Sequence, residues 1–255
     1  MKSLQDLEVK NEKSGISVVT GDGLDMRSEF DGYSSSYDAL LKDPIRDRFV
    51  RDSGFFHLRK WLLLQNFLRR RRFPAKEARW LDVGCGKGEL LRLGRDSFRE
   101  AVGCDPSLEM LKDCRDLQIR HQTDPSALPF EDASVDVVTA VCVYHHLAPA
   151  EQRAVTREAW RVLRPGGIFA IFEHNPWNPA TRIIVGRTPV DANAVLLTAG
   201  KVRRIMRAAG LTPVKTTNYL FLPERLFGVM GRLEDWLAMV PAGGQFAVFG
   251  TRAPR

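Results

Sequence analysis

Two hydrophobic patterns alternate along most of the chain. Short apolar runs rich in valine, isoleucine, leucine and phenylalanine are typical of strands buried on both faces. Between them, apolar residues recur at the spacing of an amphipathic helix. Strand patterns cover residues 79–84, 100–105, 117–122, 135–144, 167–173, 211–222 and 243–253, and helical patterns cover residues 88–97, 107–116, 150–163, 198–210 and 224–240. Strands that alternate with helices predict βαβ units and a parallel α/β sheet.

The region before residue 79 has no comparable run of strands. Apolar residues at helical spacing in residues 30–78 predict at least two helices, which we expect to form a lid over the sheet. Residues 1–29 alternate polar and apolar positions only weakly, which predicts a flexible arm. Residues 79–255 then form the α/β domain, in which residues 173–197 are a proline- and asparagine-rich insertion that follows a strand.

Composition narrows the class of protein. Of the 255 residues, 44% are hydrophobic, which is enough for a sizeable core in a folded, soluble protein. The amino terminus has no apolar leader and no run is long enough to cross a bilayer, so we expect a cytoplasmic protein without a membrane partner. The net charge of +7 suits an anionic partner, but the arginine run 69–72 ends a helical pattern, where cations offset the helix dipole. A solvated helix face accounts for that run better.

The cysteines give no sign of a metal site. They are Cys85, Cys104, Cys114 and Cys142. None of their spacings matches a metal-binding pattern, so we expect reduced structural thiols and no metal.

Three glycines follow the first strand at alternate positions, in the stretch LDVGCGKGEL. Glycine is costly in regular structure, so Gly84, Gly86 and Gly88 predict a turn that something approaches closely. In an α/β sheet, ligands bind beyond the carboxyl ends of the strands, where this turn lies. A dinucleotide fingerprint would need glycine at position 89, where Glu89 stands, and this argues against an NAD-dependent oxidoreductase.

Carboxylates surround the expected ligand site. Asp82 precedes the glycine turn, Asp105 ends the second strand and Asp124 follows the third. A carboxylate at the end of the second strand can accept hydrogen bonds from both hydroxyls of a ribose, and Asp124 can accept one from an adenine amino group. The sequence equally allows Asp105 to be a helix N-cap and Asp124 to be a turn former. The acidic surroundings, without a phosphate-binding lysine, suit a ligand that carries positive charge.

Together these motifs resemble class I S-adenosylmethionine-dependent methyltransferases. The resemblance rests on LDVGCGKG, Asp105 in AVGCD, Asp124 in DPSALPF, VDVVTAVCVYHHL and RVLRPGGIF, in the family's usual order, and covers roughly residues 79–172. The segment FDGYSSSYD resembles the helical lid of members that act on small molecules. The resemblance implies a Rossmann-like seven-stranded sheet whose last strand is antiparallel, with helices on both faces, an N-terminal helical cap and S-adenosyl-L-methionine lying across the glycine turn.

The resemblance also assigns residues to the cofactor. These are Asp82, Gly84, Cys85, Gly86, Gly88, Asp105, Pro106, Asp124, Cys142, Tyr37 and Lys60. Asp82 is expected near the amino group of the cofactor. Tyr37 either closes over the cofactor or packs within the lid, and Lys60, with Arg59, either reaches the cofactor carboxylate or lies on a surface helix face.

Two adjacent histidines follow the fourth strand, where the family faces its methyl acceptor. His145, and secondarily His146, is the candidate catalytic base, because a histidine titrates near neutral pH; a packing role is the alternative. Candidate substrate residues, which have a loop-stabilising or lid-packing role as their alternative, are Tyr33, Glu173, His174, Trp177, Arg182 and Arg187.

The resulting hypothesis is an enzyme that methylates a small-molecule acceptor on oxygen, nitrogen or carbon, for example in natural-product or surface-glycan biosynthesis. Basic residues near the pocket favour an anionic or carrier-linked acceptor. A nucleic-acid methyltransferase or binding module is the alternative; it is disfavoured because VYHHL stands where nucleic-acid N-methylating enzymes carry an Asn/Asp-Pro-Pro-aromatic tetrad.

Overall fold

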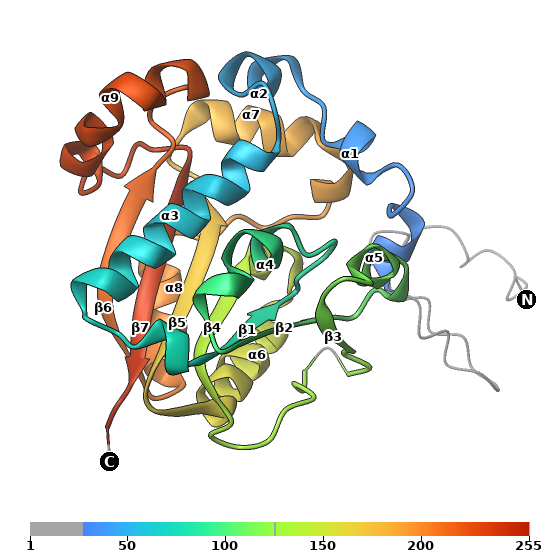
Figure 1. Ribbon diagram of the computed structural model, residues 1–255. Coiled ribbons are helices and arrows are strands. Elements are labelled where there is room, and N and C mark those ends of the chain that lie inside the picture. Colours follow the sequence, from blue (N-terminus) through green and yellow to red (C-terminus); the bar gives the residue numbers. More distant parts are fainter. Residues whose placement is uncertain (1–27, 125, 255) are drawn as a thin grey trace, which may run out of the picture.

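A computed structural model describes residues 28–124 and 126–254, and seven strands in this part of the chain form a single sheet (Figure 1). The strands are β1 (Arg79–Val83), β2 (Glu100–Asp105), β3 (Gln118–His121), β4 (Val135–Val141), β5 (Leu163–His174), β6 (Leu211–Tyr219) and β7 (Gln245–Arg252). Their order is β3-β2-β1-β4-β5-β7-β6. Strands β1 to β5 pair in parallel, whereas β7 is antiparallel to both β5 and β6. The predicted Rossmann-like sheet with an antiparallel last strand is therefore confirmed.

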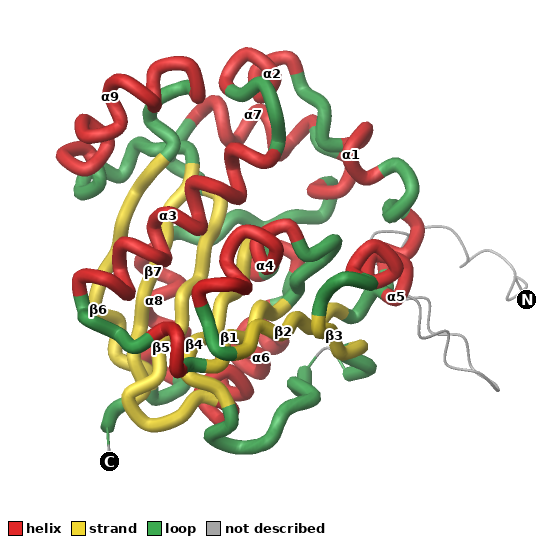
Figure 2. The backbone as a smooth tube through the Cα atoms, in the orientation of Figure 1, coloured by secondary structure: helices red, strands yellow, loops and turns green. Residues whose placement is uncertain are grey.

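Helices cover both faces of the sheet. The α-helices are α1 (Tyr37–Leu40), α2 (Pro44–Phe49), α3 (Gly54–Arg70), α4 (Glu89–Gly94), α5 (Leu108–Leu111), α6 (Pro149–Val162), α7 (Pro179–Arg187), α8 (Ala199–Ala208) and α9 (Glu224–Leu237). Short 3-10 helices are η1 (Glu29–Gly32), η2 (Ala75–Glu77), η3 (Arg95–Ser97), η4 (Lys112–Cys114), η5 (Tyr144–His146) and η6 (Pro189–Asp191). Figure 2 shows α3 and α4 in front of the sheet and α6 and α8 behind it. Residues 1–27 of the predicted arm lie outside the described residues.

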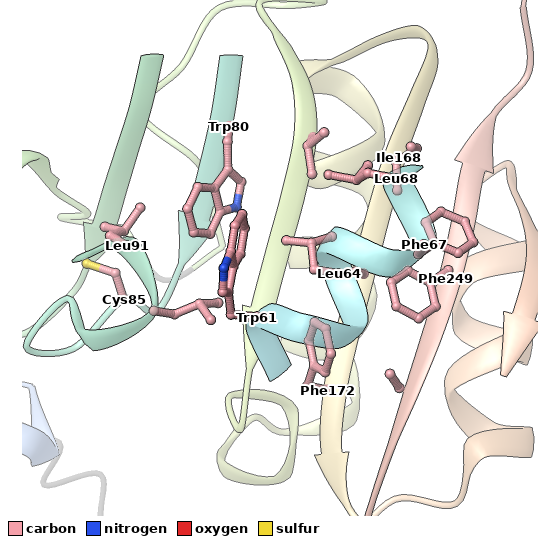
Figure 3. Packing of buried hydrophobic residues seen from close by; sticks show 14 of the residues in the cluster. Trp61, Leu64, Phe67, Leu68, Trp80, Cys85, Leu91, Ile168, Phe172 and Phe249 are labelled. Carbon is pink, nitrogen blue, oxygen red and sulfur yellow. The ribbon is translucent and has the colours of Figure 1, made fainter. Parts of the chain in front are cut away.

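The long helix of the predicted lid is part of the core. From α3, the apolar side chains of Trp61, Leu64 and Phe67 are buried against one face of the sheet (Figure 3). Trp61 stacks on Trp80 of β1 with ring centroids 6.0 Å apart, and Phe67 stacks on Phe249 of β7 at 4.1 Å. Aromatic pairs of this kind add roughly 0.5–1.5 kcal/mol to the area that they bury. Helix α3 is thus a layer of the domain, and η1, α1 and α2 are the parts of the lid that lie over the strand ends.

The proline- and asparagine-rich insertion contains a helix. Asn178 adopts an extended backbone and its side chain accepts a hydrogen bond from the backbone N–H of Thr181. Pro179 stands at the first helical position, where its missing N–H costs nothing. The residues that suggested an irregular excursion are therefore the start signal of α7, which ends at Arg187.

In the described residues, no helix is long and apolar enough to span a membrane.

Candidate active site

A cavity of about 720 Å³ lies beyond the carboxyl ends of the parallel strands. Its floor consists of the glycine turn after β1 and the residues that follow β2 and β4. Its walls come from α1, α2, α3 and α7, so the lid and the insertion at residues 173–197 both reach it. Such a crevice, at the point where the strand order reverses between β1 and β4, is where α/β sheets hold their ligands.

The three positions of the turn require glycine for different steric reasons. All adopt positive φ angles, but only Gly86 has open space where a side chain would stand. A Cβ on Gly84 would lie 2.5 Å from Val143, and one on Gly88 would lie 2.3 Å from Leu117. Gly84 and Gly86 line the cavity. Close approach by a ligand therefore explains Gly86, whereas packing within the protein already requires glycine at the other two positions.

Asp105 is held by backbone donors at the edge of the cavity. Its carboxylate oxygens accept one hydrogen bond from the N–H of Gly86 and one from that of Ser107, both at 2.8 Å. Burial raises its pKa, and these two hydrogen bonds act in the opposite direction. The N-cap of α5 is Ser107 and not Asp105, since the Ser107 hydroxyl accepts from Met110. Because each carboxylate oxygen has a second lone pair, Asp105 can still accept from a ligand.

Asp82 is a second buried acid beside the turn. It accepts a hydrogen bond from the Thr139 hydroxyl, and that hydroxyl in turn accepts from the indole N–H of Trp80. Burial raises the pKa of Asp82 to about 7, although the Thr139 hydrogen bond acts to lower it. Lys60 of α3 lines the same cavity and carries no salt bridge within the described residues. This part of the cavity can therefore hold a ligand that has both an ammonium and a carboxylate group.

The residue that follows β4 has an unusual backbone conformation. Cys142 has φ +56°, a conformation that costs a non-glycine residue about 1–3 kcal/mol. Its N–H donates to the carbonyl of Phe172 at 2.9 Å, which holds the turn against β5. The turn leads directly into η5, which carries His145 and His146, and both histidines line the cavity.

His145 is fixed from one side and faces an acid on the other. Its Nδ1 lies 2.6 Å from Glu173, and because an ionised carboxylate only accepts, Nδ1 carries the proton. Its Nε2 lies 3.4 Å from Asp191 Oδ1, and the Nε2 of His146 lies 3.5 Å from the same oxygen. Asp191 belongs to η6, at the end of the insertion. A second hydrogen bond, from the N–H of Tyr144, fixes Glu173.

The charges in this cluster depend on one another. Burial acts to lower the pKa of His145, but Glu173 and Asp191 outweigh it and raise that pKa well above 6.5. Burial and the neighbouring His145 lower the pKa of His146 and of His174 to about 4 each. The pKa of Glu173 is lowered, because His145 outweighs the effect of burial. The cluster therefore concentrates one cationic and two anionic groups at one end of the cavity.

Most residues assigned from the sequence meet at this cavity. It is lined by Tyr37, Lys60, Asp82, Gly84, Cys85, Gly86, Asp105, Pro106, Cys142, His145, His146 and His174. The cavity lining does not include Tyr33, Gly88, Asp124, Glu173, Trp177, Arg182 and Arg187. Arg59, which was expected beside Lys60, points elsewhere and pairs with Glu234 of α9.

Burial, exposure or other contacts explain why several of these residues do not line the cavity. Glu173 is fully buried beneath His145, which makes it a support and not a surface of the pocket. Trp177 is 69% exposed, Arg187 lies 3.8 Å from Asp43, and Tyr33 packs edge-on against Phe30.

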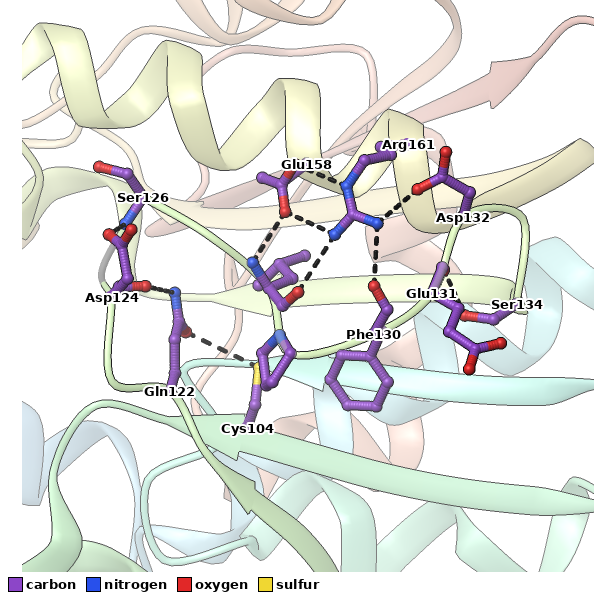
Figure 4. Close-up of polar contacts among 12 residues, drawn as sticks. Cys104, Gln122, Asp124, Ser126, Phe130, Glu131, Asp132, Ser134, Glu158 and Arg161 are labelled. Atoms are coloured by element: carbon purple, nitrogen blue, oxygen red, sulfur yellow. Dashed lines mark hydrogen bonds and ion pairs between the residues drawn. The ribbon is translucent and has the colours of Figure 1, made fainter.

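Asp124 sits in the loop that follows β3. Its carboxylate accepts from the N–H of Ser126 at 2.7 Å (Figure 4), which is the geometry of a turn former. Farther along this connection, Arg161 of α6 binds the carbonyls of Leu128 and Phe130, which ties the loop to that helix.

Several residues of the cavity were not predicted from the sequence. Asp191 is an isolated acid in TPVDAN, and no local pattern marks it. Arg46 of α2 also lines the cavity, where it lies 5.0 Å from the ring centroid of Phe56. The side chain of Glu89 faces the cavity at the start of α4, where a dinucleotide would place its diphosphate. This agrees with the argument against NAD.

Residues 81–171 match a family model described as a methyltransferase domain. This span contains the glycine turn, Asp105 and the two histidines. This span, which is less than half of the chain, is similar to methyltransferase domains.

Relatives of this methyltransferase domain differ in what their names say they methylate. It is 37% identical over 93 residues to the mouse tRNA (carboxymethyluridine(34)-5-O)-methyltransferase ALKBH8, a match that covers 36% of this chain but 14% of that protein. It is 38% identical over 103 residues to malonyl-[acyl-carrier protein] O-methyltransferase of Enterobacter lignolyticus, covering 39% of this chain and 40% of that protein. A third relative, 35% identical over 103 residues, is the 27-O-demethylrifamycin SV methyltransferase of Amycolatopsis mediterranei, covering 36% and 37%. Each match thus spans less than half of the relative's own length.

Solved structures support the fold over a longer span. A methyltransferase solved in complex with the Trm112 activator of Haloferax volcanii is 23% identical, with a TM-score of 0.62 over 90% of this chain and 99% of that one. An S-adenosylmethionine-dependent methyltransferase of Thermotoga maritima is 17% identical, with a TM-score of 0.63 over 88% and 98%.

The methyltransferase family implies S-adenosyl-L-methionine as cofactor, and the cavity of this domain fits it. The open side of Gly86 leaves room for a ligand against the turn, and Asp105 keeps acceptor capacity toward the same space. Asp82 and Lys60 offer opposite charges nearby.

Proposed function

We propose that the protein transfers a methyl group from S-adenosylmethionine to an oxygen atom of a small, largely apolar acceptor. One observation carries this proposal: a single cavity connects the glycine turn and Asp105 with an apolar pocket that ends in the histidine cluster. Cofactor and acceptor can therefore meet within one cavity, as direct methyl transfer requires.

The residues near β1 and β2 bind the cofactor in this proposal. Asp105 accepts hydrogen bonds from the ribose hydroxyls, Asp82 faces the ammonium group and Lys60 faces the carboxylate. Tyr37, from α1, covers the cofactor from the lid. The bound cofactor supplies an electrophilic methyl group on a sulfonium, so the protein needs to form no covalent intermediate.

The acceptor end has apolar walls and one polar corner. The walls are Leu41, Ile45, Phe49, Phe56, Ile184 and Val185. The polar corner consists of His145, His146, His174 and Asp191. Walls of this kind bury an apolar acceptor and exclude water, while the corner holds the nucleophilic group and assists the loss of its proton. His145 and His146 are the candidate catalytic residues.

Oxygen is the atom we favour, because a hydroxyl must lose its proton as it is methylated and the polar corner can manage that charge. The three relatives support this choice, since two are named as O-methyltransferases and the third as a methyltransferase of a 27-O-demethyl acceptor. Natural-product and surface-glycan precursors are acceptor classes of this chemistry. Arg46, which lies at the apolar wall, would suit an acceptor with an anionic or carrier-linked end.

A tRNA acceptor is the second candidate, and the likeness to ALKBH8 favours it specifically. A net charge of +7 fits a nucleic-acid partner as well. The two candidates predict different behaviour in salt. Binding to RNA weakens steeply with salt, because added salt reduces the free energy gained from counterion release, whereas binding in an apolar pocket does not.

The test uses the whole protein in two steps. Calorimetry first measures the binding of S-adenosylmethionine and of S-adenosylhomocysteine; an absence of binding to both would refute the proposal. Methyl-labelled cofactor is then incubated with the small-molecule fraction and with the tRNA fraction of a cell extract. Label that enters small molecules as a base-stable methyl ether or a base-labile methyl ester supports oxygen methylation, and label confined to tRNA supports the second candidate.

A further inference from the structure

We propose that His145, His146 and Asp191 bind a divalent transition-metal ion, Zn²⁺ by preference, at the acceptor end of the cavity. Two imidazole nitrogens and one carboxylate oxygen are the donors that catalytic zinc sites use, with a fourth position left for water or substrate. The three donor atoms lie within 4.8 Å of one another. The metal site rests on this geometry alone; only its role in catalysis rests on the proposed methyl transfer.

The two distances from the Asp191 carboxylate oxygen to the histidine nitrogens suit a tetrahedral ion. Asp191 Oδ1 is 3.4 Å from His145 Nε2 and 3.5 Å from His146 Nε2. Ligand atoms about 2.1 Å from a tetrahedral zinc ion are separated from one another by about 3.4 Å. This donor set also binds Fe²⁺ in other proteins, but the tetrahedral spacing favours zinc.

His145 provides an independent observation. Its side chain is 1% exposed, and its Nε2 makes no hydrogen bond within the described residues. A buried imidazole nitrogen that faces a carboxylate needs a cation or a proton between the two atoms, and the raised pKa of His145 corresponds to a proton there in the absence of a metal ion. A metal ion at this point would satisfy both groups.

Glu173 orients His145 as a metal ligand. It accepts a hydrogen bond from the Nδ1–H at 2.6 Å, which leaves Nε2 directed toward Asp191. Histidines that bind metals usually donate their other ring N–H to a carboxylate or a carbonyl in this way. Glu173 is itself held by the N–H of Tyr144, so the orientation does not depend on the ligand.

The three ligands come from two separate segments, η5 and η6, which meet only in the folded chain. The cysteine spacings, on which the prediction of no metal rested, therefore carry no information about this site. A metal ion here lowers the pKa of an acceptor hydroxyl. The hydroxyl proton leaves to water; the oxygen then forms a bond to the methyl carbon as the carbon–sulfur bond breaks, and the electron pair of that bond returns to sulfur.

The test measures metal binding directly, with no acceptor required. Chelator-treated protein is titrated with Zn²⁺ against a competing indicator dye, and with Co²⁺ by visible absorption. We expect one ion per chain. His146→Ala and Asp191→Asn should each weaken Zn²⁺ binding by about a hundredfold or more, and Glu173→Gln by about tenfold to a hundredfold. His121→Gln, which removes a histidine on β3 outside the cluster, should leave the affinity unchanged.

Two results would overturn the proposal: wild-type protein that binds no stoichiometric Zn²⁺ or Co²⁺, or affinity that is equal in wild type, His146→Ala and Asp191→Asn. The wild-type titration decides even if a variant fails to fold, and thermal unfolding identifies such a variant. Cofactor binding is measured on the same samples. Metal binding without S-adenosylmethionine binding would refute the proposed function but not the site, and the reverse result would refute the site alone.

Discussion

The two ends of the cavity are built in different ways. At the cofactor end, Asp105 is held by backbone N–H groups of the adjoining turns, from Gly86 and Ser107. At the proposed acceptor end, His145 is held by the side chain of Glu173 and faces that of Asp191, and both acids come from later segments. A site fixed by backbone depends on the local path of the chain, whereas a site fixed by side chains depends on how distant segments pack. The acceptor end can therefore change by substitution without altering the fold.

Asp82 is an exception at the cofactor end, because a side chain, that of Thr139, donates the hydrogen bond that it accepts. Its pKa of about 7 in the folded protein exceeds the unfolded value of 3.8. The folded state therefore retains a proton that the unfolded chain loses above pH 4, so this carboxyl makes folding less favourable as the pH rises toward 7.

We expect this carboxyl to cost roughly 3 kcal/mol of unfolding free energy between pH 5 and pH 8. Asp82→Asn should abolish that part of the pH dependence. Urea denaturation at the two pH values measures it, with the exposed Asp116→Asn as the control. An unchanged pH dependence in Asp82→Asn would show that Asp82 is ionised in the folded protein throughout this range.

Loss of His145 should affect turnover and cofactor affinity differently. We expect His145→Ala to lower methyl-transfer turnover by about a hundredfold or more, because the polar corner loses a positively charged group or, with metal bound, a metal ligand. Cofactor affinity, measured by calorimetry, should change by less than about twofold, as expected for an interaction made only in the transition state. His121→Ala is the matched control, and wild-type turnover in His145→Ala would leave that histidine a packing role only.

Loss of Asp105, unlike loss of His145, should weaken cofactor binding. Asp105→Ala should weaken binding of S-adenosylmethionine and of its demethylated product by roughly 1–3 kcal/mol, because two hydrogen bonds to the ribose are lost. Calorimetry on folded protein measures both affinities, and Asp116→Ala controls for the loss of an acid near the surface. Equal affinity in wild type and Asp105→Ala would remove Asp105 from the cofactor site.

An exchange of α7 should change the choice of acceptor and have only a limited effect on cofactor binding. Replacing residues 179–188 by the equivalent helix of a related enzyme leaves Glu173 and Asp191 in place, yet alters the wall formed by Ile184 and Val185. The preferred acceptor should change while cofactor affinity stays within about tenfold, or 1.4 kcal/mol. Competition between two acceptors measures the preference. If a folded chimera keeps its original preference, α7 does not select the acceptor.

Sequence patterns were sufficient for the sheet because each strand and helix carries its own signal. The apolar runs predicted all seven strands, and the Asn178–Pro179 pair that looked like a loop is itself a helix start. The bounds of the elements were predicted less well. Strand β5 begins at Leu163, before the expected residue 167, since Leu163 already pairs with Val135 of β4 ahead of a shift in register.

The candidate site could be predicted only in part, because some of its residues carry no signal in the local sequence. The residues that lie next to predicted strands could be placed from spacing, and Gly86 and Asp105 do line the cavity. Asp191 carries no such signal, and Glu173 was assigned to the pocket although it lies buried beneath His145. The direction of the two histidines, in turn, depends on the turn that follows β4 and contains the left-handed Cys142.

The sequence by itself determined the order of strands and helices, the glycine turn and the acid that ends β2, because periodicity and turn chemistry act between near neighbours. Only the tertiary structure decided that α3 packs as a core layer and that Asp191 lies beside the two histidines. It also decided that a side chain on Gly84 or Gly88 would clash with Val143 or Leu117. These contacts join segments far apart in the chain, and their free energy comes from burial and charge pairing that no single segment possesses.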